Sequence, residues 1–346
     1  MDTFLSAPGV AAQSSEPAPE QTELDLASLP PGRRARCFLR LGEDGLGRAV
    51  SVPVLWARGP RPGPTLGILA AVHGNELNGV AVIHRLFQSL DPRALSGTLV
   101  GVPIANPQGF LGRRRTLSDG QDLNRMMPGR ERGGEGEQLA FRLRTQLIEK
   151  LDALLDLHTA GYGRVNSVYV RADLSWPAVR KMAGWPRPEI IVHAEAPSGS
   201  VRGAAEAVGI PALTIEIGAP QRFQREPVQR ALDGVGRVLG GLGIVTSTER
   251  PDEDPRSFVC GRAGWMIAQH GGLLDVPPDV GEIVDRGRVL ARVSNLFGDV
   301  VAEYAAPERA IVVGKSTDPV CASGARMVHL GFETDLDDIP LRADAE

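Results

Sequence analysis

The amino-acid sequence predicts an α/β domain with a mostly parallel central sheet and flanking helices, followed by a small all-β domain. Short apolar runs of strand length alternate with segments whose apolar residues recur at helical spacing. That alternation is typical of strands covered by helices on both faces. After residue 257 the helical spacing stops, and short β-rich runs alternate with glycine and proline turns. The 346 residues are enough for two domains of ordinary size.

Composition divides the chain into four parts. A charged, proline-containing linker separates the second part from the third. Residues 1–32 are rich in proline, serine and glutamate, which predicts a disordered N-terminal arm. Residues 33–246 form the predicted α/β domain, and residues 258–332 form the all-β domain. The remaining residues, 333–346, are acidic, and we expect them to form a solvated tail.

The elements of the α/β domain follow from apolar runs and their spacing. Two strand-like runs, CFLRL (37–41) and VSVPVLWA (50–57), are separated by a glycine-rich turn. Continuous apolar runs then predict buried strands at residues 66–72, 98–105, 152–158 and 212–218. Three helices are predicted from apolar residues at helical spacing: Val80, Ile83, Leu86, Phe87 and Leu90; Leu139, Leu143, Leu147 and Leu151; Val228, Leu232, Val235 and Leu239.

Charge and hydropathy exclude several classes of partner. The net charge is −4 and the arginines are interspersed with acids, so the sequence shows no basic patch for nucleic acid. There is no apolar run of 18 residues and no basic segment followed by an apolar one near the N-terminus. We therefore expect no membrane partner and a cytoplasmic localisation. The oligomeric state is left open, a homo-oligomer included.

The cysteines predict neither a disulfide framework nor a thiolate metal site. Cys37, Cys260 and Cys321 are odd in number, lie far apart and form no Cys-x-x-Cys motif. We expect buried or incidental thiols.

Polar residues with metal-binding or catalytic chemistry stand at the ends of three predicted strands. His73 and Glu76 follow the first, His158 ends the run DALLDLH, and Glu216 lies within ALTIEIG. The carboxyl ends of strands in open α/β sheets are where sites are built. Two imidazoles and one carboxylate would leave the fourth coordination position of zinc open, as in catalytic sites, whereas a hydrogen-bonded structural group is the alternative. Asp156 shares a strand face with His158 and is a candidate to orient an imidazole.

A second candidate region is the loop segment 104–130, which is rich in glycine, asparagine, proline and aspartate. It contains six polar residues suited to anion recognition: Arg113, Arg114, Arg115, Asn124, Arg125 and Arg130. Loops dense in guanidinium groups bind anions or stabilise an oxyanion, because the planar fork matches carboxylate geometry. A solvated charge cluster is the alternative.

Four motifs in order resemble the succinylglutamate desuccinylase/aspartoacylase family, which belongs to the zinc carboxypeptidase superfamily. They are HGNE (73–76), DLNR (122–125), DLH (156–158) and GIPALTIEIG (209–218), and the resemblance covers about residues 50–330. It implies a zinc-carboxypeptidase-like sheet. It also implies that zinc is held by His73, Glu76 and His158, with Glu216 as the base that activates water.

The resemblance further implies residues that bind the substrate. The arginine before DLNR would polarise the substrate carbonyl, and this role falls most naturally on Arg115, although three consecutive arginines leave its two predecessors as alternatives. Asn124 and Arg125 would anchor a substrate carboxylate. Arg202, shortly before the strand that bears Glu216, is a further candidate for a carboxylate contact.

The all-β domain resembles the biotinyl/lipoyl-like fold found at the C-terminus of many members of this family. In carriers of that fold a lysine in the intervening hairpin takes the cofactor. Here the hairpin reads SNLFGD (294–299), without lysine, and Lys315 lies beyond it. We therefore expect a packing or access-limiting domain.

Taken together, these features predict a zinc-dependent amidohydrolase that removes an acetyl or succinyl group from a small N-acyl amino acid or analogue. A zinc carboxypeptidase-type peptidase acting on short peptides is the runner-up. A metal-binding scaffold without turnover is the alternative from another class. Glu216 argues against the scaffold, because three ligands suffice to bind the metal and the extra carboxylate is needed only for chemistry.

Overall fold

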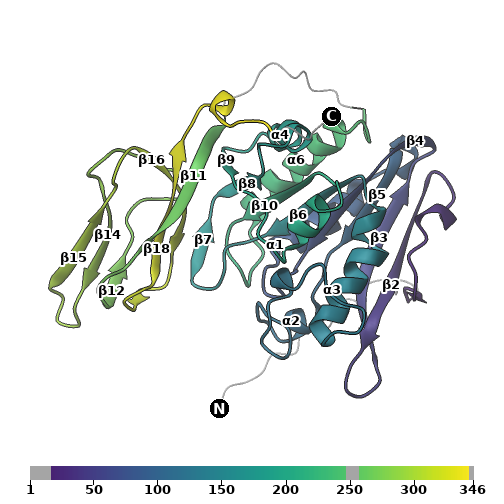
Figure 1. Ribbon diagram of the computed structural model, residues 1–346, viewed down its shortest axis with the longest axis horizontal. Coiled ribbons are helices and arrows are strands. Elements are labelled where there is room, and N and C mark those ends of the chain that lie inside the picture. The colour runs from purple at the N-terminus through teal and green to yellow at the C-terminus, as the bar shows by residue number, and fades with distance from the viewer. Residues whose placement is uncertain (1–16, 247–256, 343–346) are drawn as a thin grey trace, which may run out of the picture.

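The computed structural model describes residues 17–246 and 257–342, and its core is a mixed sheet with helices on both faces (Figure 1). The sheet runs in the order β2-β3-β5-β4-β6-β10-β8-β9 through the α/β domain. The strands are β2 (Arg33–Glu43), β3 (Ala49–Arg58), β4 (Arg61–Ala70), β5 (Ser96–Val102), β6 (Ala153–His158), β8 (Val168–Ala172), β9 (Ile190–His193) and β10 (Ala212–Ile217).

The sheet is mixed where the sequence predicted a mostly parallel one. The four predicted buried strands, β5, β4, β6 and β10, are parallel to one another, as expected. However, β3 is antiparallel to both β2 and β5, and β8 is antiparallel to β10. A short turn after β2 returns the chain directly, and such a connection joins only antiparallel strands.

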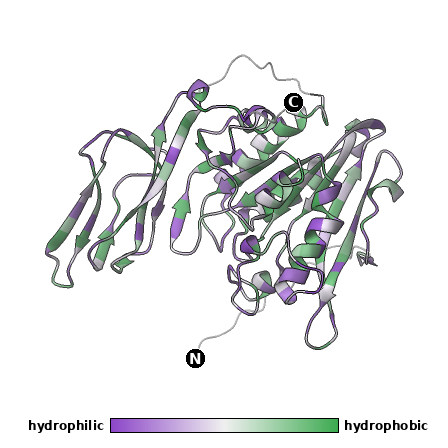
Figure 2. Ribbon diagram, in the orientation of Figure 1, coloured by the Kyte–Doolittle hydropathy of each residue, from purple (hydrophilic) through white to green (hydrophobic). Residues whose placement is uncertain are grey.

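Helices cover both faces of this sheet, and hydrophobic residues concentrate along the strands between them (Figure 2). On one face lie α1 (Asn78–Ser89), α4 (Pro177–Gly184) and α6 (Arg225–Gly241). On the other lie α3 (Glu135–Gln146) and α5 (Val201–Glu206). The remaining helical segments are α2 (Pro107–Leu111), η1 (Leu26–Ser28), η2 (Pro92–Ala94), η3 (Leu123–Arg125), η4 (Ile148–Lys150) and η5 (Leu336–Asp338).

The all-β domain extends the central sheet and adds a second one. Beyond β9 the sheet continues through β11 (Phe258–Ile267), β18 (Arg326–Glu333), β16 (Ala310–Ser316) and β13 (Ile283–Val284). A second sheet contains β15 (Val300–Ala305), β14 (Val289–Ser294), β12 (Gly272–Asp275) and β17 (Val320–Cys321). The two sheets enclose a separate hydrophobic core.

In the part of the chain that the structure describes, two strand pairings join the domains. β9 pairs with β11 in parallel, and β7 (Arg164–Asn166) pairs with β16 in antiparallel fashion. In the second pairing Asn166 lies opposite Gly314. The all-β domain is thus hydrogen-bonded to the α/β domain at two places.

The N-terminal arm predicted at residues 1–32 is ordered over its described part. β1 (Glu20–Gln21) pairs with β2, and the Leu24 side chain is fully buried in the core beneath that strand. Burial of Leu24 stabilises the segment against the core, although the segment as a whole is polar. Residues 1–16 lie outside the described residues, as does most of the predicted linker.

The acidic tail is also partly packed, which corrects the expectation of a solvated segment. Ile339 is buried against the core of the α/β domain, and its carbonyl accepts a hydrogen bond from Arg180. The Arg342 amide donates to the carbonyl of Ser175. Isolated apolar residues among acids, without regular spacing, carried too little signal to predict this contact.

The expectation about the cysteines holds. Cys37, Cys260 and Cys321 are free and buried. Over residues 17–246 and 257–342, the helices are too short or too polar to cross a bilayer.

Candidate metal and substrate site

The strand-end residues predicted from the sequence meet at one edge of the central sheet. His73 and Glu76 lie in the turn after β4, and His158 is the last residue of β6. Glu216 lies in β10, directly opposite His158 in the strand register. Because β4, β6 and β10 are parallel neighbours, their carboxyl ends bring these four side chains together.

The turn that carries His73 and Glu76 is fixed by close packing against α2. A side chain on Gly74 would overlap the backbone of Gly109 and Phe110, so only glycine fits there. Asn106, the residue before α2, also holds the turn, since its Nδ2 donates to the Val72 carbonyl. In HGNE, the glycine is therefore required for packing, and the histidine and glutamate at the two ends supply side chains to the site.

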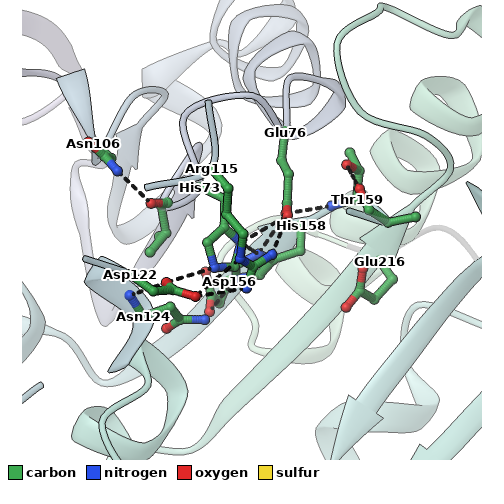
Figure 3. Close-up of polar contacts among 12 residues, drawn as sticks. His73, Glu76, Asn106, Arg115, Asp122, Asn124, Asp156, His158, Thr159 and Glu216 are labelled. Carbon is green, nitrogen blue, oxygen red and sulfur yellow. Dashed lines mark hydrogen bonds and ion pairs between the residues drawn. The ribbon is translucent and has the colours of Figure 1, made fainter. Parts of the chain in front are cut away.

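Three donor groups converge on one point in this buried region (Figure 3). The Nδ1 atoms of His73 and His158 lie 3.0 Å apart. Each is 2.9 Å from an oxygen of the Glu76 carboxylate. Two imidazole nitrogens turned toward each other and toward a carboxylate form a group that could hold a metal ion.

Each imidazole has a carboxylate behind it. The Nε2 atom of His73 is 3.2 Å from Asp122, and that of His158 is 2.9 Å from Asp156. Asp156 lies on the same strand face as His158, as strand alternation predicted. Asp122 was missed, although it is the first residue of the DLNR motif. Carboxylates in this position orient a ligating histidine and increase its basicity.

The surroundings of Glu76 and His158 favour the charged forms of both side chains, although both are buried. Burial alone would raise the pKa of the Glu76 carboxyl, but the charge of His73 and contacts with both imidazoles hold this pKa well below its usual range. Burial would lower the pKa of His158, whereas Asp156 and Glu76 raise it above its ordinary value. The surroundings thus support positive charge between the two imidazoles.

Arg115 is the arginine of the triplet that reaches the site. Its Nη1 lies 3.1 Å from Glu76, and its Nη2 lies 3.1 Å from Asp122. Arg113 and Arg114 are exposed and do not line the cavity.

The other residues of the loop divide between the cavity and its surroundings. Asn124 and Arg125 line the cavity, and the Asn124 side-chain oxygen accepts a hydrogen bond from the Val201 amide. Arg130 instead pairs with Glu137 at the surface. The loop therefore contributes Asn124, Arg125 and Arg115 to the site, but not Arg130.

Glu216 is a buried carboxylate beside the three donor groups (Figure 3). Its Oε2 accepts a hydrogen bond of 3.0 Å from Asn166 in β7. Burial raises the pKa of Glu216 above the ordinary glutamate value. Asn166 was missed, because nothing in the sequence around it indicates that β7 returns to the site.

Arg202 lines the cavity, but its guanidinium is held by the protein. Nη1 pairs with Glu206 at 3.2 Å, and Nη2 donates to the carbonyls of Ala194 and Glu195. The side chain is 2 % exposed. These contacts favour a structural role over the substrate contact predicted from the sequence.

The cavity over the site measures about 200 Å³ and is lined from both domains. From the all-β domain come Trp265 in β11 and Arg326 and His329 in β18. From β7 comes Arg164. None of these was among the predicted site residues, because the sequence gives no sign of which strands of the second domain face the first.

Comparison with known proteins shows which family this architecture resembles. The profile of the succinylglutamate desuccinylase/aspartoacylase catalytic domain matches residues 62–242. The chain is 25% identical over 293 residues to N-alpha-acetyl-L-2,4-diaminobutyric acid deacetylase of Halomonas elongata, covering 80% of this chain and 85% of that protein.

Solved structures share the fold over both domains. The product-bound ectoine utilization protein of Ruegeria pomeroyi superposes with a TM-score of 0.78 at 24% identity, covering 88% of this chain and 97% of that one. A succinylglutamate desuccinylase/aspartoacylase from Rhodobacter sphaeroides superposes with a TM-score of 0.80 at 22% identity, covering 91% of this chain and 100% of that one. These likenesses show the fold.

Proposed function

The chain belongs to the succinylglutamate desuccinylase/aspartoacylase family, and we propose that it is a zinc-dependent amidohydrolase that removes an acetyl or succinyl group from a small N-acyl amino acid. The observation that carries the proposal is the buried Glu216 carboxylate beside the His73, Glu76 and His158 donor group. The deacetylase name of the Halomonas relative supports an acyl amino acid as substrate. We also propose that its central sheet is of the zinc-carboxypeptidase type.

The chemistry of the donor set fits zinc. Zinc in catalytic sites takes three protein ligands from imidazole and carboxylate groups, and His73, Glu76 and His158 supply such a set. Asp122 and Asp156 supply the carboxylates that support the two imidazoles. When bound, zinc acts as a Lewis acid on an amide carbonyl and makes water more acidic.

Glu216 moves the protons of the reaction. Its carboxylate accepts a proton from the attacking water and returns it to the nitrogen of the leaving amine. Asn166 holds one oxygen of this carboxylate, so the other oxygen is directed to the proton transfer. The raised pKa of Glu216 makes it a stronger base than an exposed glutamate.

Arginine and asparagine side chains orient the substrate. Arg115, which already contacts Glu76 and Asp122, stabilises the negative charge that develops on the amide oxygen during attack. Arg125 and Asn124 line the same cavity and bind the carboxylate of the amino acid. Binding of this carboxylate places the amide of the substrate beside Glu216.

The two alternative functions, a peptidase and a metal-binding scaffold, would use the site differently. A peptidase for short peptides would use the same residues and would differ only in the amide that it cleaves. A metal-binding scaffold would need the three donor groups but not Glu216.

The test is a panel of N-acetyl and N-succinyl amino acids assayed beside free and blocked peptides, using zinc-loaded wild type and Glu216→Gln in parallel. We expect hydrolysis of the acyl amino acids by the wild type and little by the variant. Peptide release without acyl hydrolysis, absent from the variant, would replace the proposal with the peptidase. Zinc binding without any turnover would favour the scaffold.

A further inference from the structure

The second sheet of the all-β domain has an outer face that is partly apolar. Its strands β15, β14, β12 and β17 lie at the end of the molecule remote from the helices of the α/β domain (Figure 1). Their inward side chains, such as Val293 and Cys321, are buried in the core between the two sheets. Their outward side chains instead remain largely exposed to solvent in the part of the chain that the structure describes.

Strand register joins apolar residues of this outer face into one row. Val300 in β15 lies opposite Ser294 in β14. Leu273 in β12 lies opposite Ser294 on one side and opposite Val320 in β17 on the other. Residues that lie opposite each other point to the same side of a sheet, so the four side chains form a line across all four strands. Three members of this apolar row are hydrophobic.

Two strongly exposed side chains extend the apolar row at the hairpin between β14 and β15. Phe297 is 93% exposed and Leu296 is 84% exposed. With Val301, which follows Val300, and the hydrophobic members of the row, they present on the order of 600 Å² of apolar surface, the upper end of what a monomeric protein exposes as one patch. A patch of this size is typical of an interaction site.

A row of alternating charge runs beside the apolar row on the same face. Arg292 in β14 lies opposite Glu303 in β15 on one side and opposite Asp275 in β12 on the other. The charges across the sheet are therefore negative, positive and negative, and Arg292 pairs with Glu303 at 2.7 Å. Like charges set against each other across an interface are unfavourable, so this order restricts how the face can bind a copy of itself.

One twofold arrangement of two copies matches both rows. An axis parallel to the strands, between β12 and β14, sets β12 of one copy against β14 of the other, and β15 against β17. Arg292 of each copy then faces Asp275 of the other, so opposite charges meet twice. The same axis sets Val300 against Val320, and the hairpin with Phe297 lies beside β17 of the second copy. Sheets pack face to face in this way at a separation of about 10 Å.

We propose that the outer face of the second sheet binds a second copy of this chain and forms a twofold dimer through the all-β domains. The apolar patch and its charged row together approach the area of about 800 Å² per partner that a specific interface buries. The match of the charged row to itself under one axis favours a second copy over an unrelated partner. The cavity residues of this domain lie in β11 and β18 of the other sheet, so the dimer leaves the cavity open and does not depend on the proposed function.

Sedimentation velocity of the full chain over a range of concentrations measures the dimer. We expect a monomer–dimer equilibrium with a Kd in the micromolar range or tighter, as for specific interfaces of standard size. Phe297→Ser, which removes an aromatic anchor, should raise this Kd by about 30-fold or more. Leu46→Ser is the matched control, because Leu46 is a similarly exposed leucine in the turn between β2 and β3, and it should leave the Kd unchanged. Thermal denaturation checks that each variant is folded.

A charge exchange tests the axis itself. Arg292→Asp and Asp275→Arg should each weaken the homodimer, because each sets like charges against each other at both contacts. A mixture of the two variants restores opposite charges at both contacts, so native mass spectrometry should detect a heterodimer in preference to either homodimer.

Three results would overturn the proposal. The first is a wild type that stays monomeric at every concentration, including one that instead sediments with phosphatidylcholine vesicles and so assigns the patch to a membrane surface. The second is a dimer whose Kd is the same in wild type and Phe297→Ser. The third is a mixture of the charge variants that forms no heterodimer.

Discussion

Substituting Asp156 with asparagine would test whether the carboxylate behind His158 supports metal binding. Asp156 is 1 % exposed, and its Oδ2 lies 2.9 Å from Nε2 of His158. Asparagine has nearly the same volume, so the fold should be retained while the negative charge is lost. Partners that orient a ligating histidine change metal affinity by about 10–100-fold, which corresponds to about 1.4–2.7 kcal/mol.

The structure places the expected loss in the upper part of that range. The corresponding contact of Asp122 with His73 is longer, at 3.2 Å, its side chain is 22% exposed, and it is shared with Arg115. Buried, unshared contacts are screened less by water. Asp156→Asn should therefore weaken zinc binding more than Asp122→Asn does.

Competition with a chelator of known zinc affinity would measure the effect, with His158→Ala as the reference for loss of a ligand. Denaturation of the metal-free protein supplies the control. Because Asp156 raises the pKa of His158, removing its charge also affects the stability of the metal-free protein, which this control measures separately from zinc binding. Unchanged zinc affinity, or an equal loss of metal-free stability, would refute the orienting role.

Three further predictions concern the base, the arginine triplet and the C-terminal segment. Glu216→Gln should keep the metal, as measured by metal analysis, and lose roughly 10²–10⁴-fold in kcat; an active variant would move the base elsewhere. Arg115→Ala should lower kcat through weaker oxyanion stabilisation, whereas the exposed Arg114→Ala should not, and the reverse result would reassign the role. Ile339→Ala should destabilise the protein by about 2–5 kcal/mol in urea denaturation, while Leu341→Ala, at a site 53% exposed, should have little effect; equal effects would contradict the packed position of the segment.

The parts of the fold that sequence reasoning predicted are those with a strong local signal. Continuous apolar runs such as residues 66–72 and 152–158 identify the buried strands, and helical spacing identifies α1, α3 and α6. The direction of β8 and the packing of Ile339 depend on contacts distant in sequence. No local pattern carries that information.

The candidate site shows the same division. His73 and Glu76 follow one apolar strand and His158 ends another, so strand ends indicated one shared sheet edge, and the resemblance to the family implied their roles as ligands. Asn166 and Arg326 could not, since each reaches the cavity only because β7 and β18 are brought to it by pairing between domains.

That pairing also links the evolution of the two domains. Asn166, which holds the Glu216 carboxylate, lies opposite Gly314 in β16, and a side chain on Gly314 would overlap the Asn166 amide oxygen. A substitution in the second domain can therefore displace the base in the first without touching the cavity. The two domains must accumulate compensating changes together, and exchanging the second domain for that of a relative would require a matched β7.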